Sequence, residues 1–233
     1  MRAHLALAAA AALLPWLAPP AARGQEVLDQ GIFLIAHEGV EVGREEFAIQ
    51  ATPGRQGRPG IRAVATDHYR DREVRVALDL TNEHVPVSYQ ADVTVAGRIS
   101  ARLSGQAGRG RFAVRIVSQA GEIVREFAMP VGAVVLDDDG FDQFYFLPRP
   151  DGDAPRPVSL LLPRQTRIVT GEVRGEGYDT VAVGGHAVLA RRYILAIAGG
   201  ENRAFWFSPT GSLLKVAVPS KSLTATRLSL PPR

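Results

Sequence analysis

The chain has 233 residues, no cysteine, and 27 basic against 24 acidic residues, which gives a formal net charge of +3. The absence of cysteine excludes disulfides, thiolate metal sites, a cysteine nucleophile and a lipid-modified cysteine. The basic residues are scattered singly and only two of them are lysine. Nucleic-acid-binding proteins instead concentrate basic residues on one face or stripe, so we expect no nucleic-acid partner.

The first 24 residues have the pattern of a secretory signal peptide. Arg2 gives a basic start, Leu5–Leu17 is apolar, and small residues flank Arg23 where a signal peptidase would cleave. The apolar stretch is shorter than the roughly 20 residues that a membrane-spanning helix needs. We therefore expect cleavage before Gln25 and, since the chain lacks cysteine, export to a bacterial periplasm. The mature part, residues 25–233, is expected to be a single domain without a transmembrane segment.

Alternation of apolar and polar residues predicts strands in the first half of the mature chain. Gly31–His37 and Val40–Gln50 are expected strands, and Gly43 marks a change of apolar parity that indicates a bulge or sharp bend. Thr52–Gly60 has the composition of a loop. Further strands are expected at 74–80, 85–95, 99–103, 112–116 and 122–129. One face of these strands is apolar and the other polar, which predicts an antiparallel meander that curls into a barrel or half-barrel.

The pattern changes after Pro130. Phe141, Phe144 and Tyr145 have helical spacing, which predicts one short amphipathic helix of about two turns that packs as a plug or a lid. The Pro-rich segment 148–157 is expected to be a stiff linker between two meander halves. Strands of the second half are expected at 158–162, 166–174, 178–183, 186–198, 203–207, 212–218 and 223–230. The predicted class is thus mainly β.

The clearest structural signal is the hairpin within Tyr193–Val218. With Pro209-Thr210 as a two-residue loop, Phe205 would pair with Leu214 and Trp206 with Leu213, on opposite faces. Both faces of the hairpin would then be apolar, so something must cover the second one. Two candidates are the predicted helix and a bound apolar ligand.

No catalytic motif is present, and we expect no catalytic residue and no cofactor. The mature chain has four histidines without metal-binding spacing, which we expect in solvent or in turns: His37, His68, His84 and His186. No serine lies in a nucleophile elbow. The Gly-rich segment 105–110 joins two alternating strands and is expected to be a hairpin loop.

Two acidic segments are candidate sites. Asp137–Asp142 lacks the D-x-D-x-D spacing and the distal glutamate of a calcium loop, so we expect its carboxylates to cap the predicted helix and to bind no metal. The run Asp67–Arg72 mixes acidic, basic and aromatic groups in an expected loop. A charged surface turn explains this run better than an active site, unless Asp67, His68 and Asp71 line one cleft.

Several segments resemble a family of uncharacterised exported bacterial β-rich domains of unknown function. The similar segments are Gly39–Phe47, Val134–Asp138, Phe144-Tyr145, Ala190–Tyr193, Phe205–Phe207 and Gly211–Val216, together with Arg227. Such domains are loosely similar to periplasmic lipoprotein carriers, which are half-barrels closed by helices over a hydrophobic cavity. The resemblance implies binding of a lipid or an acyl chain, although this chain has one short helix candidate where the carriers use more.

The first functional hypothesis is accordingly a periplasmic, non-enzymatic protein that binds an apolar or amphiphilic ligand. The expected cavity residues are Phe141, Phe144, Tyr145, Phe146, Tyr193, Trp206 and Leu213. The alternative is a structural envelope protein that binds a protein partner through a sheet edge or a loop. A hydrolase is the third hypothesis, because none of the usual catalytic arrangements occurs.

Overall fold

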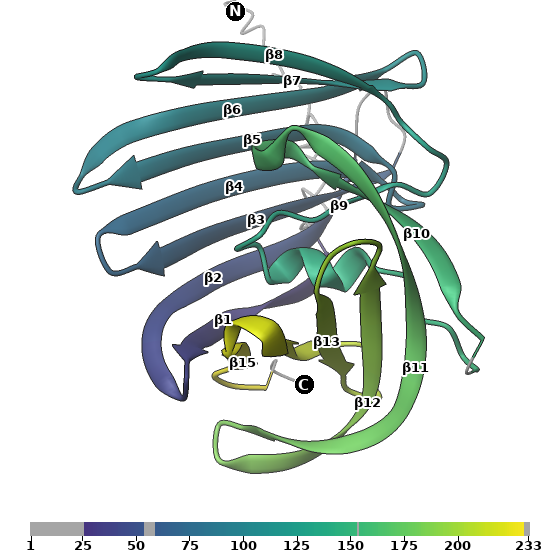
Figure 1. Ribbon diagram of the computed structural model, residues 1–233. Coiled ribbons are helices and arrows are strands. Elements are labelled where there is room, and N and C mark those ends of the chain that lie inside the picture. Colours follow the sequence, from purple (N-terminus) through teal and green to yellow (C-terminus); the bar gives the residue numbers. More distant parts are fainter. Residues whose placement is uncertain (1–25, 54–58, 153, 231–233) are drawn as a thin grey trace, which may run out of the picture.

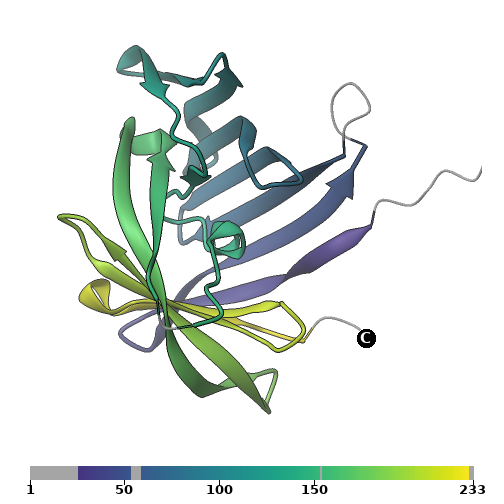
Figure 2. The same ribbon diagram turned by 90° about the vertical axis from the view of Figure 1, so that its right-hand side faces the viewer.

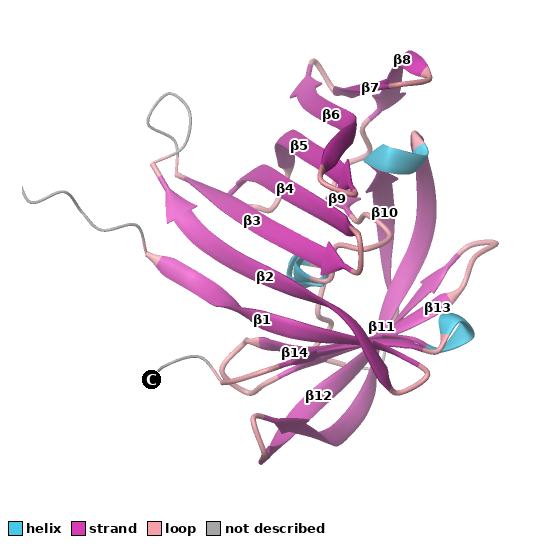
Figure 3. Ribbon diagram, turned by 90° about the vertical axis from the view of Figure 1, so that its left-hand side faces the viewer, coloured by secondary structure: helices cyan, strands magenta, loops and turns pink. Residues whose placement is uncertain are grey.

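The computed structural model describes residues 26–53, 59–152 and 154–230, so the predicted signal peptide lies outside the described residues. These residues form one sheet of 15 strands in the order β8-β7-β6-β5-β4-β3-β2-β1-β15-β14-β13-β12-β11-β10-β9 (Figures 1 and 3). All neighbours are antiparallel except β9 and β10. The predicted antiparallel meander is confirmed. Barrel closure is not seen, because β8 and β9 are the two edges of the sheet.

Consecutive hairpins build the first half of the sheet. Its strands are β1 (Val27–His37), β2 (Val40–Thr52), β3 (Gly60–Tyr69), β4 (Arg72–Thr81), β5 (Pro86–Val95), β6 (Arg98–Gly108), β7 (Arg111–Ser118) and β8 (Gly121–Ala128). Two expectations were wrong here. Residues 60–69 form a strand although no strand was predicted for them, and residues 105–108 belong to β6, so that the turn lies at Arg109-Gly110.

The second half contains β9 (Val134–Val135), β10 (Arg156–Leu162), β11 (Arg167–Val183), β12 (His186–Ile197), β13 (Asn202–Phe207), β14 (Leu213–Val218) and β15 (Leu223–Arg227). Strand β11 covers two predicted strands, and a register shift between Gly175 and Tyr178 marks the point where they meet. The C-terminal β15 pairs with the N-terminal β1, with Phe33 opposite Arg227. The two halves are therefore joined through the chain ends into one continuous sheet.

The predicted bulge at Gly43 is confirmed. Ile35 of β1 lies opposite Gly43, whereas the next residue, Ala36, lies opposite Glu41, so Val42 is the extra residue. Gly43 also lies opposite Tyr69 of β3. A β-carbon at this position would lie 2.4 Å from the carbonyl oxygen of His68, so the crowded backbone requires glycine.

Gly43→Ala should therefore lower the free energy of unfolding by about 1–3 kcal/mol, the usual cost of overpacking. Urea unfolding of the variant measures this loss. Gly108→Ala is the matched control, because a β-carbon there meets no atom within 4 Å. The control should change stability by less than about 0.5 kcal/mol. Equal effects of the two substitutions would contradict the crowding argument.

The β13–β14 hairpin is apolar on both faces, as predicted, but its register differs. Trp206 lies opposite Lys215 and Phe205 opposite Val216, with a shift before the Phe207–Leu213 pair. The predicted Phe205–Leu214 and Trp206–Leu213 pairs were wrong, because the turn spans Ser208–Gly211 and not two residues.

The second apolar face is covered by the sheet itself. Trp206 and Leu214 pack in a separate outer core against Val181 and Val183, from the far end of the β11–β12 hairpin. The indole nitrogen of Trp206 also donates a hydrogen bond to Asp179 of the same hairpin, at 3.0 Å. Neither the helix nor a ligand is needed to cover this face.

The predicted helix is a 3-10 helix of five residues, η2 (Asp142–Phe146), and is shorter than two α-helical turns. Two shorter 3-10 turns, η3 (Pro163–Gln165) and η4 (Pro219–Lys221), follow strands β10 and β14. None of the helices in the described part of the chain has the length and hydrophobicity to cross a membrane.

Candidate functional site

A strap, defined as residues Asp137–Leu147, leaves the sheet after β9 and crosses its concave face. Strand β9 makes only two residue pairs with β10, and Leu136 donates one more hydrogen bond to Leu161, at 3.0 Å. The chain then turns inward and forms η2 between the two halves of the sheet (Figure 2). The strap is thus held at the interior of the fold rather than added to a sheet edge.

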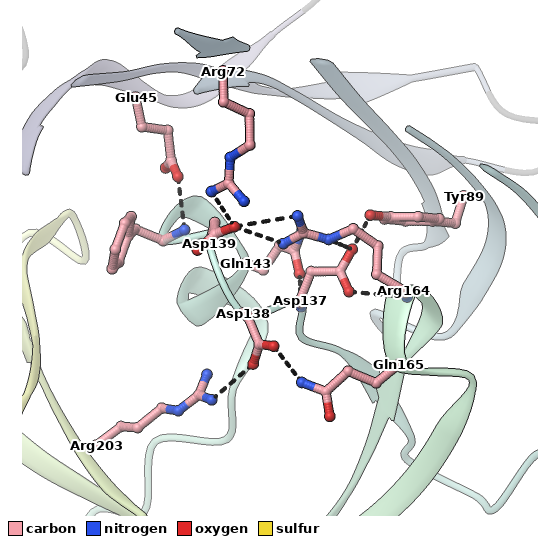
Figure 4. Close-up of polar contacts among 11 residues, drawn as sticks. Glu45, Arg72, Tyr89, Asp137, Asp138, Asp139, Gln143, Arg164, Gln165 and Arg203 are labelled. Carbon is pink, nitrogen blue, oxygen red and sulfur yellow. Dashed lines mark hydrogen bonds and ion pairs between the residues drawn. The ribbon is translucent and has the colours of Figure 1, made fainter. Parts of the chain in front are cut away.

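The first residues of the strap are bound to the sheet by ion pairs and hydrogen bonds (Figure 4). The Asp137 carboxylate lies 3.1 Å from Nε of Arg164, and it accepts a hydrogen bond from the buried hydroxyl of Tyr89. Asp139 lies 2.6 Å from Nη2 of Arg72 and 3.2 Å from Nη1 of Arg164. Strands β4 and β5 and the turn after β10 therefore hold the same short segment.

The expected capping role of Asp137–Asp139 was wrong. These carboxylates bind arginines, and Asp138 in turn contacts Arg203 at 3.3 Å and the amide of Gln165. No side chain of the helix caps η2. Instead Glu45 of β2 accepts a hydrogen bond from the backbone N–H of Phe141 at 2.7 Å and from that of Asp142 at 2.6 Å.

Three carboxyl groups meet where the strap contacts β2 and β3: Glu45, Asp67 and Asp142. Glu45 is 0% exposed and the other two are 1% exposed. The carboxyl groups of Glu45 and Asp67 are neighbours, and each lies close enough to shift the pKa of the other. We call this group the carboxyl cluster.

Burial raises the pKa of each member of the carboxyl cluster, because the charged form loses its hydration. The pKa of Asp67 rises to about 8 and that of Asp142 to about 7. The pKa of Glu45 lies well above its ordinary value, through burial first and then through repulsion by Asp67 and Asp142. The cluster therefore holds protons under conditions where carboxyl groups in water have lost them.

Polar atoms without a partner lie in the same region. Among the described residues, no hydrogen-bond partner exists for Oδ1 of Asp67, Oδ1 of Asp142, the hydroxyl of Tyr69 or Nε2 of Gln143. No group of three or more metal-ligating side chains has the geometry for an ion in the described part of the chain. Close by, a surface groove of about 370 Å³ has Tyr69 and Arg72 among its lining residues.

The second part of the strap is aromatic and fills the concave face. Phe141, Phe144 and Phe146 are each at most 3% exposed. Phe144 packs on Phe205 of β13 with ring centroids 5.7 Å apart, and Phe205 stacks on Tyr193 at 5.3 Å. Side chains of the chain itself therefore occupy this part of the interior.

The structure brings together six of the seven expected cavity residues, since Phe141, Phe144, Tyr145, Phe146, Tyr193 and Leu213 all belong to the concave core or pack against it. Trp206 does not join them, because its side chain points to the outer core. The physical reason is the alternation of the strand: Phe205 and Phe207 face inward, so Trp206 faces outward.

The conditional hydrolase site is not assembled. Asp67 lies in β3 and not in a loop, and it faces the interior, whereas His68 is exposed on the opposite face and Asp71 lies in the exposed turn to β4. The expectation for the histidines is confirmed: His37, His68 and His186 are exposed, and His84 lies half-buried in a turn.

Sequence reasoning did not single out Glu45, Tyr89 or Arg164. A signal existed for Glu45, which shares the parity of Phe47 and Ile49 and so lies on the apolar side of its strand. An acidic residue at such a position is buried unless the strand is irregular. Nothing local marks Arg164, whose partners lie 25 or more residues away in the chain.

Fold and site together define an open antiparallel β-sheet whose concave face is filled by a strap of its own chain. No protein-family model matches the chain, and no curated protein or solved structure does.

Proposed function

We propose that the protein is exported to the periplasm and, without chemistry of its own, binds an apolar or amphiphilic ligand such as a lipid or an acyl chain. The ligand would occupy the concave face of the sheet in place of the aromatic part of the strap. One observation carries the proposal: the strap is fixed by polar contacts at its start, whereas its aromatic residues fill an apolar surface that includes Tyr193, Phe205 and Leu213.

On the concave face, the aromatic side chains of the strap and an acyl chain would gain comparable burial free energies. Burial stabilises an aromatic side chain of this size by about 1.5–3 kcal/mol and an acyl chain by about 0.8 kcal/mol per methylene. A chain of ordinary length therefore offsets the exposure of Phe144 and Phe146. The 3-10 helix that carries them has poorer hydrogen-bond geometry than an α-helix, which lowers the cost of moving it.

The test is native mass spectrometry of protein purified from a periplasm, together with binding of a fluorescent fatty acid. Phe144→Ala combined with Phe146→Ala should increase the bound fraction, because it empties part of the concave face. Trp206→Ala is the matched control: it also removes a large aromatic side chain, but from the outer core, and should leave binding unchanged. The absence of bound lipid and fatty acid from both the wild type and the double variant would refute the proposal.

A second candidate function is binding of an envelope protein through the edge strand β8. All but one of its eight residues are exposed, and Ile123 and Val124 are 46% and 55% exposed. An edge of this length presents unpaired backbone groups to which a partner can add a strand. A photo-crosslinker at Val124 should then capture one dominant partner in cells, and capture of none would reject this candidate.

A further inference from the structure

We propose that the strap is controlled by protons: protons bound to the carboxyl cluster keep the segment Phe141–Leu147 seated on the sheet, and loss of these protons releases it. The cluster spans the contact between two parts of the chain. Glu45 and Asp67 belong to strands β2 and β3, whereas Asp142 belongs to the strap. Repulsion among the three carboxylates therefore acts to separate the strap from the sheet.

The same cluster holds the strap in place. The two oxygens of Glu45 accept the N–H groups of Phe141 and Asp142, at 2.7 and 2.6 Å. Among the described residues, no other side chain caps the start of η2. A change in the position or charge of Glu45 therefore directly alters the hydrogen bonds that it accepts from the strap backbone.

No ion pair joins a cation to a member of the cluster in the described part of the chain. The ion pairs of the strap involve Asp137, Asp138 and Asp139 and leave out Asp142, Glu45 and Asp67. Oδ1 of Asp67 and Oδ1 of Asp142 are buried without a hydrogen-bond partner. Buried carboxylates in such surroundings avoid the cost of ionisation by binding protons.

The neighbouring charged groups do not cancel this effect. From β3 and the strap, Tyr69 and Asp139 face the cluster, and Asp139 adds negative charge at Asp67. From η3, Arg164 acts in the opposite sense, but it is already paired with Asp137 and Asp139. The groups of β4 and β5 are bound elsewhere: Arg72 to Asp139 and Tyr89 to Asp137.

The direction of the pH dependence follows from a comparison of the seated strap with the released strap. In the released strap the carboxyl groups are hydrated and titrate near pH 4, whereas burial raises the pKa of Asp142 to about 7 and that of Asp67 to about 8. The seated state therefore binds more protons. It is most stable in acid and loses stability as pH rises from about 4, by about a factor of ten per pH unit for each extra proton that it holds, until Asp142 and Asp67 lose their protons near pH 7 and 8.

Release would uncover the concave face, so the switch regulates the ligand site and in that respect rests on the proposed function. The switch itself can be measured without any ligand. The ion pairs of Asp137 and Asp139 keep the start of the strap attached, so the movement is confined to the aromatic part.

The experiment is hydrogen exchange of the ligand-free mature protein between about pH 5.5 and pH 9, expressed as protection factors to remove the intrinsic effect of pH. Protection of the amides of Phe141–Leu147 should fall by at least about tenfold per pH unit between pH 5.5 and pH 7 and less steeply above about pH 8, while that of β1–β4 stays constant. Asp142→Asn and Asp67→Asn should each flatten this slope. Asp138→Asn is the matched control on the same strap, because its carboxylate is paired with Arg203, and it should keep the wild-type slope.

Infrared spectroscopy gives a second readout that does not depend on the stability of the variants. The band of a protonated carboxyl group should disappear between about pH 6 and pH 9 in the wild type. A strap whose protection is independent of pH, or a carboxyl band that is lost below about pH 5, would overturn the inference. If the strap depends on pH but the protein binds no lipid, the switch is supported and the proposed ligand binding is refuted. If the protein binds lipid but the strap does not depend on pH, ligand binding is supported and the switch is refuted.

Discussion

Arg227→Met should lower the free energy of unfolding by about 3–5 kcal/mol, because it leaves a buried carboxylate without its cation. Nη1 of Arg227 lies 2.8 Å from Oδ1 and 3.0 Å from Oδ2 of Asp29. Arg227 is 2% exposed and Asp29 is 4% exposed. The loss is large because a charge buried to this extent has neither water nor another cation to stabilise it.

The position of this pair in the sheet adds to its effect. Asp29 belongs to β1, and Arg227 ends β15, which pairs with β1 to join the two halves of the sheet. The guanidinium also donates hydrogen bonds to the carbonyl oxygens of Leu213, Ser229 and Gln30. One side chain therefore connects the first strand, the last strand and the residues that follow.

A double-mutant cycle measured by urea unfolding tests this prediction. Asp29→Leu together with Arg227→Met removes both charges and should recover most of the loss, although the three carbonyl oxygens lose their donor. Acid should also reduce the defect of Arg227→Met, because burial raises the pKa of Asp29 and protonation removes the unpaired charge. A loss below about 1 kcal/mol in the single variant would show that the pair contributes little.

The sequence predicted the strands where large apolar residues alternate with polar ones and missed the strand where they do not. Val74, Val76 and Leu78 mark β4, and the structure places all three in the concave core. The inward residues of β3 are Ile61, Ala63, Ala65 and Asp67. Two alanines and an aspartate give a weak apolar signal, so the segment resembled a loop although its pairing with β2 and β4 is regular.

The site could be predicted less well than the fold, because its contacts join distant parts of the chain. Glu45 binds the backbone of Asp142, 97 residues later, and Arg227 binds Asp29, 198 residues away. Strand alternation places Glu45 on a buried face but does not say which segment crosses that face. That information depends on how far the sheet curls, which arises from twist and bulges along all its strands.

The cover on the outer face of the β13–β14 hairpin could not be predicted either, because it too comes from another part of the chain. Its two apolar faces are visible in the sequence, but the cover on the outer face comes from a bend in β11 at the Gly175–Tyr178 register shift. The bend returns Val181 and Val183 to the back of the same sheet, where they meet Trp206 and Leu214. The β13–β14 hairpin therefore belongs to two cores, and substitutions in each core should lower the free energy of unfolding separately.

Phe205→Ala should lower the free energy of unfolding by about 3–5 kcal/mol, because Phe205 is fully buried in the concave core and its truncation leaves a cavity there. The neighbouring Trp206→Ala should cost a similar amount in the outer core, and it also removes the hydrogen bond to Asp179. The two side chains are adjacent in sequence but share no packing partners. Thermal and urea unfolding of the single variants measure both losses.

The separation of the two cores can be tested with milder substitutions that leave the variants folded. Phe205→Leu combined with Trp206→Leu should give additive losses within about 0.5 kcal/mol, since the side chains lie on opposite faces. Phe205→Leu combined with Phe144→Leu should instead show a coupling above about 0.5 kcal/mol, since these rings are in contact at 5.7 Å. Coupling between Phe205 and Trp206, together with additivity between Phe205 and Phe144, would show that the strap is not packed on β13. The ligand face would then have to lie elsewhere.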